Sequence, residues 1–228
     1  MATLRLASYN VHRAIGRDGR CEPERILAVL REIDADVWAL QEVEAHDNGG
    51  DMLAWLAAET GFEPIAGTTL VRHDGHYGNG LLTRCPVTAK ALCDLSWRGR
   101  EPRGAISVDV DCDGEPLRIV ATHLGLRPAE RREQVQRLLR LFSERPGDRA
   151  VLVGDLNEWF LWGRPLRRLH KYFDETPAVR TFPAHFPMFA LDRLWTHPGT
   201  ILKGLKAHDS EKARVASDHL PLVATLQL

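Results

Sequence analysis

Polar side chains that can bind a metal ion or a proton follow four apolar runs of this sequence. They belong to Asn10, Glu42, His123 and Asp155, each at the carboxyl end of its run. Strand ends are rigid and their loops open to solvent, so we expect these side chains to meet at one site. Asn157, two residues beyond Asp155, and Asp192, Asp218 and His219 near the carboxyl terminus are further candidates.

The types of these residues indicate a reaction. Oxygen ligands such as Glu42, Asn10 and Asp218 suit a hard cation, with Mg²⁺ preferred and Mn²⁺ or Ca²⁺ as substitutes. Zinc would prefer several His and Cys at close spacing, which the sequence lacks. A metal, a carboxylate base and one or two imidazoles can neutralise a phosphate ester and orient an attacking water. We therefore expect a metal-dependent phosphoesterase.

Two other hydrolytic classes find no support. The sequence has no GxSxG nucleophile elbow and no GxxxxGK[ST] loop, which disfavours a serine hydrolase and a P-loop NTPase. Loss of Glu42, Asp155 or His219 would favour a non-catalytic binding module, and all three are present, so that module stays open only as a remote alternative.

Residues that would contact the substrate are less sharply indicated. The candidates are His12, Asn79, Arg103 and Trp159. Arg103 can bind a phosphate bidentately, with a plain surface arginine as the equal alternative. Trp159 can form a stacking wall, or it can simply pack under a loop. A second loop carrying Phe182, Phe186 and Phe189 would add an apolar rim suited to a lipid-like or nucleoside leaving group.

The polar motifs together resemble the endonuclease/exonuclease/phosphatase superfamily, whose members are DNase I-like. The matching segments are Ser8-Tyr9-Asn10, Leu40-Gln41-Glu42, Thr122-His123-Leu124, Gly154-Asp155-Leu156-Asn157, Leu191-Asp192-Arg193 and Ser217-Asp218-His219. Each is weak alone, but six in the family's order across most of the chain are specific. The resemblance implies an α/β (α+β) four-layer sandwich, with two mostly antiparallel sheets face to face and helices outside.

The resemblance also implies a metal site. Glu42 would be the principal Mg²⁺ ligand, Asn10 would lie beside it, and Asp218 would complete the set. The substrate would be a phosphate ester, either nucleic acid or a phospholipid or small phosphodiester.

The same resemblance implies catalytic roles. Asp155 would orient and deprotonate the attacking water, and Asn157 would hold the phosphate or the water. His219 would contact the phosphate, Asp192 would fix the tautomer of His219, and His123 would stabilise the transition state. The division of acid–base duty between Asp155 and His219 stays open.

One position departs from a branch of the superfamily. Abasic-site endonucleases carry a carboxylate two positions after the first Asn, where this chain has His12. That weakens an assignment as an abasic-site endonuclease, and it leaves open whether the site holds one metal ion or two. The chain is more similar to a small bacterial subgroup of predicted metal-dependent hydrolases, with Gly-Asp-x-Asn-Glu-Trp at 154–159 and Thr-Phe-Pro-Ala at 181–184.

Hydrophobic periodicity predicts the elements that would position these residues. We expect helices at 23–33, 52–60 and 128–143. We expect strands at 4–9, 37–40, 80–83, 87–92, 151–153, 191–196 and 222–228. The strands at 191–196 and 222–228 would be the last two of the chain. Residues 105–122 read as a hairpin with its turn at Asp113-Gly114. Hairpins mixed with strand–helix units exclude a simple Rossmann alternation.

Composition sets the remaining expectations. The 228 residues suit one domain, 1–228, which we expect to be a monomer. A net charge of -1 gives no strong overall field for nucleic acid, but Arg98, Arg100, Arg164, Arg167, Arg168 and Lys171 can still form a local track with Arg103. We expect the four cysteines to be free thiols in a reducing cytoplasm, with no signal peptide and no membrane span.

Overall fold

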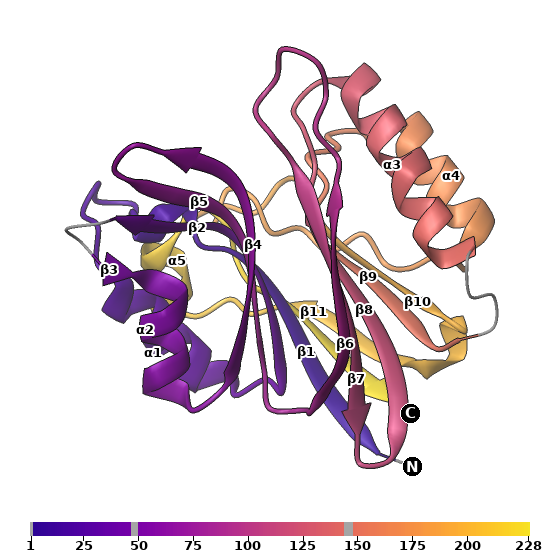
Figure 1. Cartoon of the computed structure of the whole chain (residues 1–228), viewed down its shortest axis with the longest axis horizontal. Helices are drawn as coiled ribbons and strands as arrows, with labels where there is room; N and C mark the ends of the chain where they lie inside the picture. The colour runs from indigo at the N-terminus through magenta and orange to yellow at the C-terminus, as the bar shows by residue number, and fades with distance from the viewer. Residues whose placement is uncertain (1, 47–49, 144–147) are drawn as a thin grey trace.

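Two β-sheets pack face to face in the computed structural model, which describes residues 2–46, 50–143 and 148–228 (Figure 1). The first has the order β11-β12-β1-β2-β5-β4, with short β3 paired to β2, and the second has the order β10-β9-β8-β7-β6. The strands of the first sheet are β1 (Thr3–Asn10), β2 (Val37–His46), β3 (Gly50–Asp51), β4 (Glu63–Arg72), β5 (Gly75–Thr83), β11 (Leu202–Ala207) and β12 (Leu222–Gln227). Those of the second are β6 (Val87–Asp94), β7 (Gly104–Cys112), β8 (Glu115–His123), β9 (Ala150–Asp155) and β10 (Asp192–His197).

Helices cover the outer face of each sheet. Against the first sheet lie α1 (Pro23–Ile33), α2 (Met52–Thr60) and α5 (Glu211–Ala216), and against the second lie α3 (Pro128–Ser143) and α4 (Arg164–Tyr172). Figure 1 shows these two helical layers on opposite sides of the sheets. The four-layer α-β-β-α arrangement expected from the sequence is confirmed.

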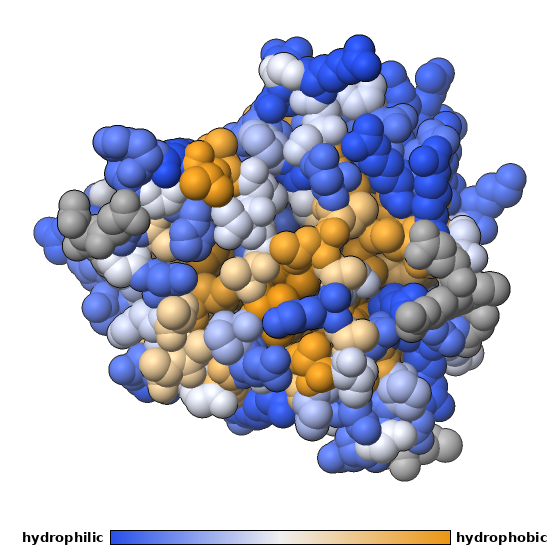
Figure 2. Space-filling model, viewed as in Figure 1, coloured by the Kyte–Doolittle hydropathy of each residue, from blue (hydrophilic) through white to orange (hydrophobic). Residues whose placement is uncertain are grey.

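Three apolar clusters separate the four layers, because strands covered on both faces bury both sets of alternating side chains. In β1, Leu4 and Leu6 point between the two sheets, whereas Ala7 and Tyr9 face the helices. Figure 2 shows one face of the molecule, where apolar residues gather in the middle and hydrophilic residues surround them.

Most strand pairs are antiparallel, and the two parallel pairs follow helical crossovers. β1 and β2 are joined through α1, and β8 and β9 through α3. Parallel neighbours bring their carboxyl ends to the same edge of a sheet. Asn10, His123 and Asp155, at the ends of β1, β8 and β9, lie at one end of the sandwich. β2 continues to His46, beyond the strand expected at 37–40, so Glu42 lies within β2 rather than at its end.

The expected helices at 23–33, 52–60 and 128–143 have those bounds in the structure. Local signals explain the agreement for the first two. Pro23 occupies the first turn of α1, and the Asp51 carboxylate caps α2 by accepting from the amides of Leu53 and Ala54. The 105–122 hairpin is also confirmed, with positive φ at Asp113 and Gly114 in its turn.

Five strands and helices were not expected, namely β3, β4, β11, α4 and α5. The prediction that the strands near 191–196 and 222–228 are the last two is wrong, because β11 lies between them. β4 and β11 are edge strands, so half of their side chains face solvent and their apolar alternation is weak. α4 is short and rich in arginine, and its buried positions are only Pro165, Leu166 and Leu169.

All four cysteines are free thiols, as expected. Among the described helices, none combines the length and apolar character needed to cross a membrane.

The core between the sheets yields a stability prediction. Ile119 is fully buried there, so Ile119→Ala should lower the free energy of unfolding by about 2–5 kcal/mol. The exposed Leu92 on β6 is the matched control, and Leu92→Ala should change it by less than about 0.5 kcal/mol. Urea unfolding followed by tryptophan fluorescence measures both. Equal effects in the two variants would contradict the assigned core.

Candidate active site

Strand register in the second sheet aligns three candidate residues in one row. His123 on β8 is paired with Asp155 on β9, and Asp155 is paired with Asp192 on β10. Neighbouring strands lie about 4.8 Å apart, so the three side chains are held together by the sheet itself. His219 reaches the same row from the loop before β12.

The first sheet faces this row with Asn10 and Glu42. Asn10 Nδ2 lies 3.2 Å from Glu42 Oε1 and 3.2 Å from Asp155 Oδ2, so one amide links carboxylates from both sheets. Its Oδ1 accepts a hydrogen bond from the His12 amide at 3.1 Å. Glu42 sits in a bulge of β2 with φ 58°, a conformation that costs energy in a non-glycine residue and turns its side chain toward the site.

Asp155 is the buried centre of the arrangement. Gly154 precedes it with φ 143°, and a Cβ there would lie 1.8 Å from the Thr122 carbonyl oxygen, so only glycine fits. The Asn157 amide donates to Asp155 Oδ1 at 2.8 Å, while Oδ2 lies 3.5 Å from His123 Nε2 and 3.8 Å from His219 Nε2. Burial, reinforced by Asp192, raises the pKa of Asp155 to about 6 despite the opposing His219.

His219 is held by a buried carboxylate behind it. Its Nδ1 donates to Asp192 Oδ2 at 2.8 Å, and Thr181 Oγ1 donates to the same oxygen at 2.5 Å. Burial opposes the imidazolium, but the attraction and hydrogen bond of Asp192, followed by Asp155 and Asp218, raise the pKa of His219 to about 10. The Nε2 atom therefore carries a proton that points toward the cleft.

His123 has the opposite character. Burial, then the positive charges of Arg103 and His219, lower the pKa of His123 well below its usual value. Arg103 Nη1 lies 3.1 Å from His123 Nδ1 and Asn157 Nδ2 lies 3.0 Å from His123 Nε2, so both ring nitrogens face hydrogen-bond donors. Asn157 Nδ2 also donates to the Leu124 carbonyl at 2.9 Å.

These residues open on a cleft of about 410 Å³. Nine of the residues expected from the sequence line it, namely Asn10, Glu42, Arg103, His123, Asp155, Asn157, Trp159, Asp218 and His219. Three others do not line it in the described structure. Asp192 lies behind His219, His12 contacts Asp218 at 3.8 Å, and the Asn79 amide donates to the Gly104 carbonyl at 3.0 Å.

The cleft also has walls that the sequence did not indicate. They include Arg13, Arg72, Tyr77, Glu101 and Leu126. These five residues lie outside the motifs, and only the packing of the two sheets brings them together. Phe182 of the expected apolar loop and Leu191 of the Leu191-Asp192-Arg193 motif also line the cleft. The reading of Arg103 as a plain surface arginine is wrong, because its side chain is buried and its Nη1 also contacts Glu101 Oε1 at 3.1 Å.

A second missed feature is a buried ion pair beside the cleft. Arg131 Nε lies 3.2 Å from Glu158 Oε2, and both side chains are almost completely buried. Arg131 Nη1 also donates to the Leu126 carbonyl at 2.7 Å, and Glu158 Oε1 accepts from the Phe160 amide at 3.3 Å. The pair joins two loops of the cleft wall. A Glu-Trp dipeptide after the Asp155 motif was the only sequence signal for it.

Within the described residues, one group of three acidic or imidazole side chains has donor atoms within 4.8 Å of one another: Asp155, Asp192 and His219. Asp192 Oδ2 in this group already accepts from both His219 and Thr181. Glu42 and Asp218, by contrast, present carboxylate oxygens to the cleft itself. These hard oxygen donors fit a cation such as Mg²⁺ better than a nitrogen- or sulfur-preferring metal.

Carboxylates, imidazoles and a buried arginine thus line one cleft at the shared end of the two packed sheets. A model of the endonuclease/exonuclease/phosphatase family matches residues 7–219. The chain belongs to this family of nucleases and phosphatases, enzymes that act on phosphate esters.

Individual relatives extend this comparison. The chain is 31% identical over 248 aligned positions to the uncharacterized protein YbhP of Escherichia coli (strain K12), covering 99% of this chain and 97% of YbhP. An endonuclease/exonuclease/phosphatase from Beutenbergia cavernae DSM 12333 is similar with TM-score 0.81 and 25% identity, over 100% of this chain and 72% of that one. The human Nocturnin catalytic domain with bound sulfate anion shares the fold, with TM-score 0.75 and 18% identity over 99% and 93% of the two chains.

The buried ion pair yields a prediction. Arg131→Met leaves the Glu158 carboxylate buried and unpaired, so it should lower the free energy of unfolding by about 3–5 kcal/mol. The double variant Arg131→Met/Glu158→Gln removes both charges and should recover part of that loss, as measured by urea unfolding. Additive losses in the double variant would show that the two side chains do not act as a pair.

Proposed function

We propose that this chain is a Mg²⁺-dependent phosphodiesterase in which Asp155 activates the attacking water. The observation that carries the proposal is the environment of the Asp155 carboxylate. It is buried, it borders the cleft, burial raises its pKa to about 6, and it lies within 4 Å of two imidazoles of contrasting charge. A general base works best when its pKa is near the working pH.

Glu42 and Asp218 would hold the Mg²⁺, with Asn10 beside them. Glu42 and Asp218 both line the cleft, and Asn10 Nδ2 lies 3.2 Å from Glu42 Oε1. When bound there, the ion would neutralise charge on the phosphate and lower the pKa of a water. We assign the Asp155, Asp192 and His219 group to proton handling instead, because Asp192 is committed to its hydrogen bonds with His219 and Thr181.

The protein groups would divide the remaining work. Asp155 Oδ2 accepts the proton of the attacking water. His219, kept cationic by Asp192, donates from Nε2 to a phosphate oxygen or to the leaving group. His123 stays neutral, because of its burial and the neighbouring Arg103, and would stabilise charge in the transition state. Asn157, beside both His123 and Asp155, holds the phosphate or the water.

A phosphomonoesterase would use the same residues. Comparing hydrolysis of a phosphodiester with hydrolysis of a phosphomonoester distinguishes the two activities. A non-catalytic module is disfavoured by the shared position of Asp155, His219 and Asp192, since two buried carboxylates beside one imidazole are costly without a use.

Replacement of Asp155 tests the base. Asp155→Asn keeps the shape but removes the proton acceptor, so kcat for Mg²⁺-dependent hydrolysis of bis-p-nitrophenyl phosphate should fall by about 10²–10⁴-fold. The rate of hydrolysis of p-nitrophenyl phosphate, measured beside it, compares a monoester with the diester. Wild-type activity in this variant would overturn the role of Asp155, and activity unaffected by chelator would overturn the metal.

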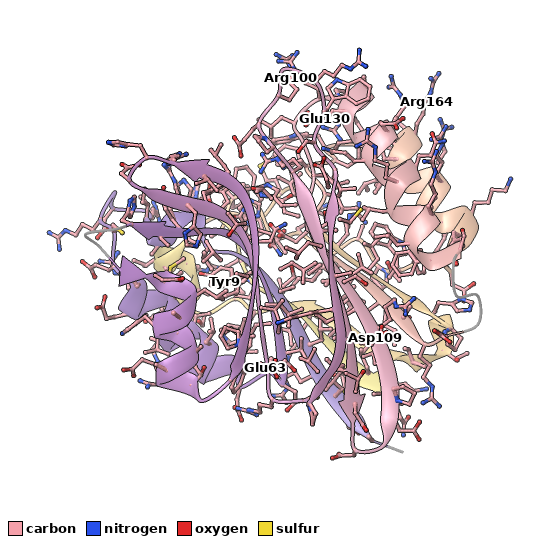
Figure 3. The ribbon with its side chains drawn as sticks, in the orientation of Figure 1. Tyr9, Glu63, Arg100, Asp109, Glu130 and Arg164 are labelled. Carbon is pink, nitrogen blue, oxygen red and sulfur yellow. The ribbon has the colours of Figure 1, made fainter. Side chains whose placement is uncertain are left out.

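Replacement of Glu42 tests the metal site separately. Glu42→Gln should raise the Mg²⁺ concentration needed for half-maximal activity by at least about tenfold, because one charged ligand is lost. Glu63→Gln on β4 is the matched control, since Glu63 is exposed and lies outside the cleft (Figure 3). An unchanged Mg²⁺ requirement in Glu42→Gln would place the metal elsewhere.

A further inference from the structure

Six apolar side chains stand exposed around one side of the cleft. They are Leu126, Phe160, Leu161, Trp162, Phe186 and Met188, and they are between 53% and 71% exposed. We call these six residues the apolar rim. Three of them are consecutive, and the six come from three loops. Soluble proteins seldom expose apolar groups in such a concentration, so the rim indicates a contact surface.

The loops of the rim are joined to the cleft and to one another. Trp159 lines the cleft and directly precedes Phe160, and its ring packs 5.0 Å from Phe189 and 5.9 Å from Phe182 in the loop that carries Phe186 and Met188. Leu126 also lines the cleft. The rim is therefore continuous with the mouth of the proposed active site.

A buried ion pair holds the exposed part of the rim in place. Arg131 donates to the carbonyl of Leu126, and its partner Glu158 accepts from the amide of Phe160. Gly163 then closes a turn by donating to the Phe160 carbonyl at 3.1 Å. Phe160, Leu161 and Trp162 are thus presented on an anchored turn, which lowers the ordering cost of inserting them into another phase.

Arginines border the rim. Arg127 follows Leu126, Arg164 follows Trp162 by two residues, and Arg168 Nη1 donates to the Arg132 carbonyl at 3.4 Å. Within the described parts of the chain these four guanidinium groups have no ion-pair partner. Residues 159–173 contain no Asp or Glu. Figure 3 places Arg164 at the same end of the molecule as Arg100 and Glu130.

Several arginines elsewhere are paired with carboxylates. Arg25, Arg31 and Arg214, beside the helices of the first sheet, lie within 2.9 Å of Asp18, Glu59 and Asp209 respectively. The molecule has a net charge of only -1, so its unneutralised positive charge beside the cleft is a local feature. It complements an anionic surface.

We propose that the apolar rim and its four arginines seat the cleft on an anionic phospholipid surface, and that the substrate is a phosphodiester in a lipid head group. This inference rests on the proposed function. Leu126, Leu161 and Met188 have no ring on which a base could stack, whereas the interface of a bilayer accepts aliphatic and aromatic side chains alike. With the rim inserted, the head-group phosphates would lie at the height of the cleft mouth.

Vesicle sedimentation of the full chain tests the surface. Wild type should pellet with vesicles of phosphatidylcholine mixed with phosphatidylglycerol, more strongly than with phosphatidylcholine alone. Phe160→Ser/Trp162→Ser should weaken this binding by at least about tenfold, because two exposed aromatic groups no longer enter the interface. Arg164→Glu/Arg168→Glu should abolish the preference for anionic lipid.

Two controls separate this inference from the proposed function. Leu92→Ser, an equally exposed apolar residue on β6, should bind vesicles like wild type. All of these variants should hydrolyse soluble bis-p-nitrophenyl phosphate at the wild-type rate, since none of the changed residues lines the cleft. If wild type itself does not hydrolyse soluble bis-p-nitrophenyl phosphate, the proposed function is contradicted instead.

The inference is overturned if wild type fails to pellet with anionic vesicles, or if the rim variants pellet as well as wild type. It is also overturned if the same variants lose binding to a single-stranded oligonucleotide while no vesicle binding is seen, because the rim would then be a nucleic-acid surface. Hydrolysis of phosphatidylglycerol vesicles, measured as release of glycerol phosphate or of glycerol, that falls with the rim variants at unchanged soluble activity would support the lipid head group as substrate.

Discussion

Two carboxylates, Asp155 and Asp192, lie side by side in the interior, and their burial is the constraint on which the site depends. An unpaired buried charge is costly, and the charge of Asp192 on the adjacent strand adds to the burial that raises the pKa of Asp155. His219 offsets this cost by bonding Asp192 and facing Asp155. Thr181 and the amide of Asn157 take further lone pairs of the two carboxylates. The cleft is therefore a network in which each polar group stabilises its neighbours.

The apolar layers make that network possible. The β8–β9–β10 register is held by side chains buried on both faces of the sheet, so His123, Asp155 and Asp192 cannot shift relative to one another without exposing the core. The second sheet supplies the proton-handling row, and the first supplies Asn10 and Glu42. Asn10 links the two sheets within the site, because its side-chain amide contacts the carboxylates of both Glu42 and Asp155.

The two imidazoles show how surroundings divide the roles of identical side chains. His219 lies against Asp192 and keeps its proton, whereas His123 lies against Arg103 and stays neutral. Arg131 and Glu158 extend the same logic to the cleft wall, where a buried pair orders the loops that carry the apolar rim. The proposed chemistry and the proposed lipid contact thus depend on neighbouring polar contacts within one end of the sandwich.

Periodicity and capping residues in the sequence determined the three long helices, the hairpin at 105–122 and the strands whose ends carry Asn10, His123 and Asp155, because those signals are local. The family's motifs pointed to seven of the candidate residues that line the cleft, and Arg103 and Trp159 were expected on their residue types. The edge strands β4 and β11 and the short helices α4 and α5 escaped, since their apolar alternation is weak. Only the tertiary structure decided that Arg103 is buried against His123, that Arg131 pairs with Glu158, and that three loops form one rim. Those contacts join residues far apart in the chain, and packing of the two sheets, rather than any local pattern, sets their distances.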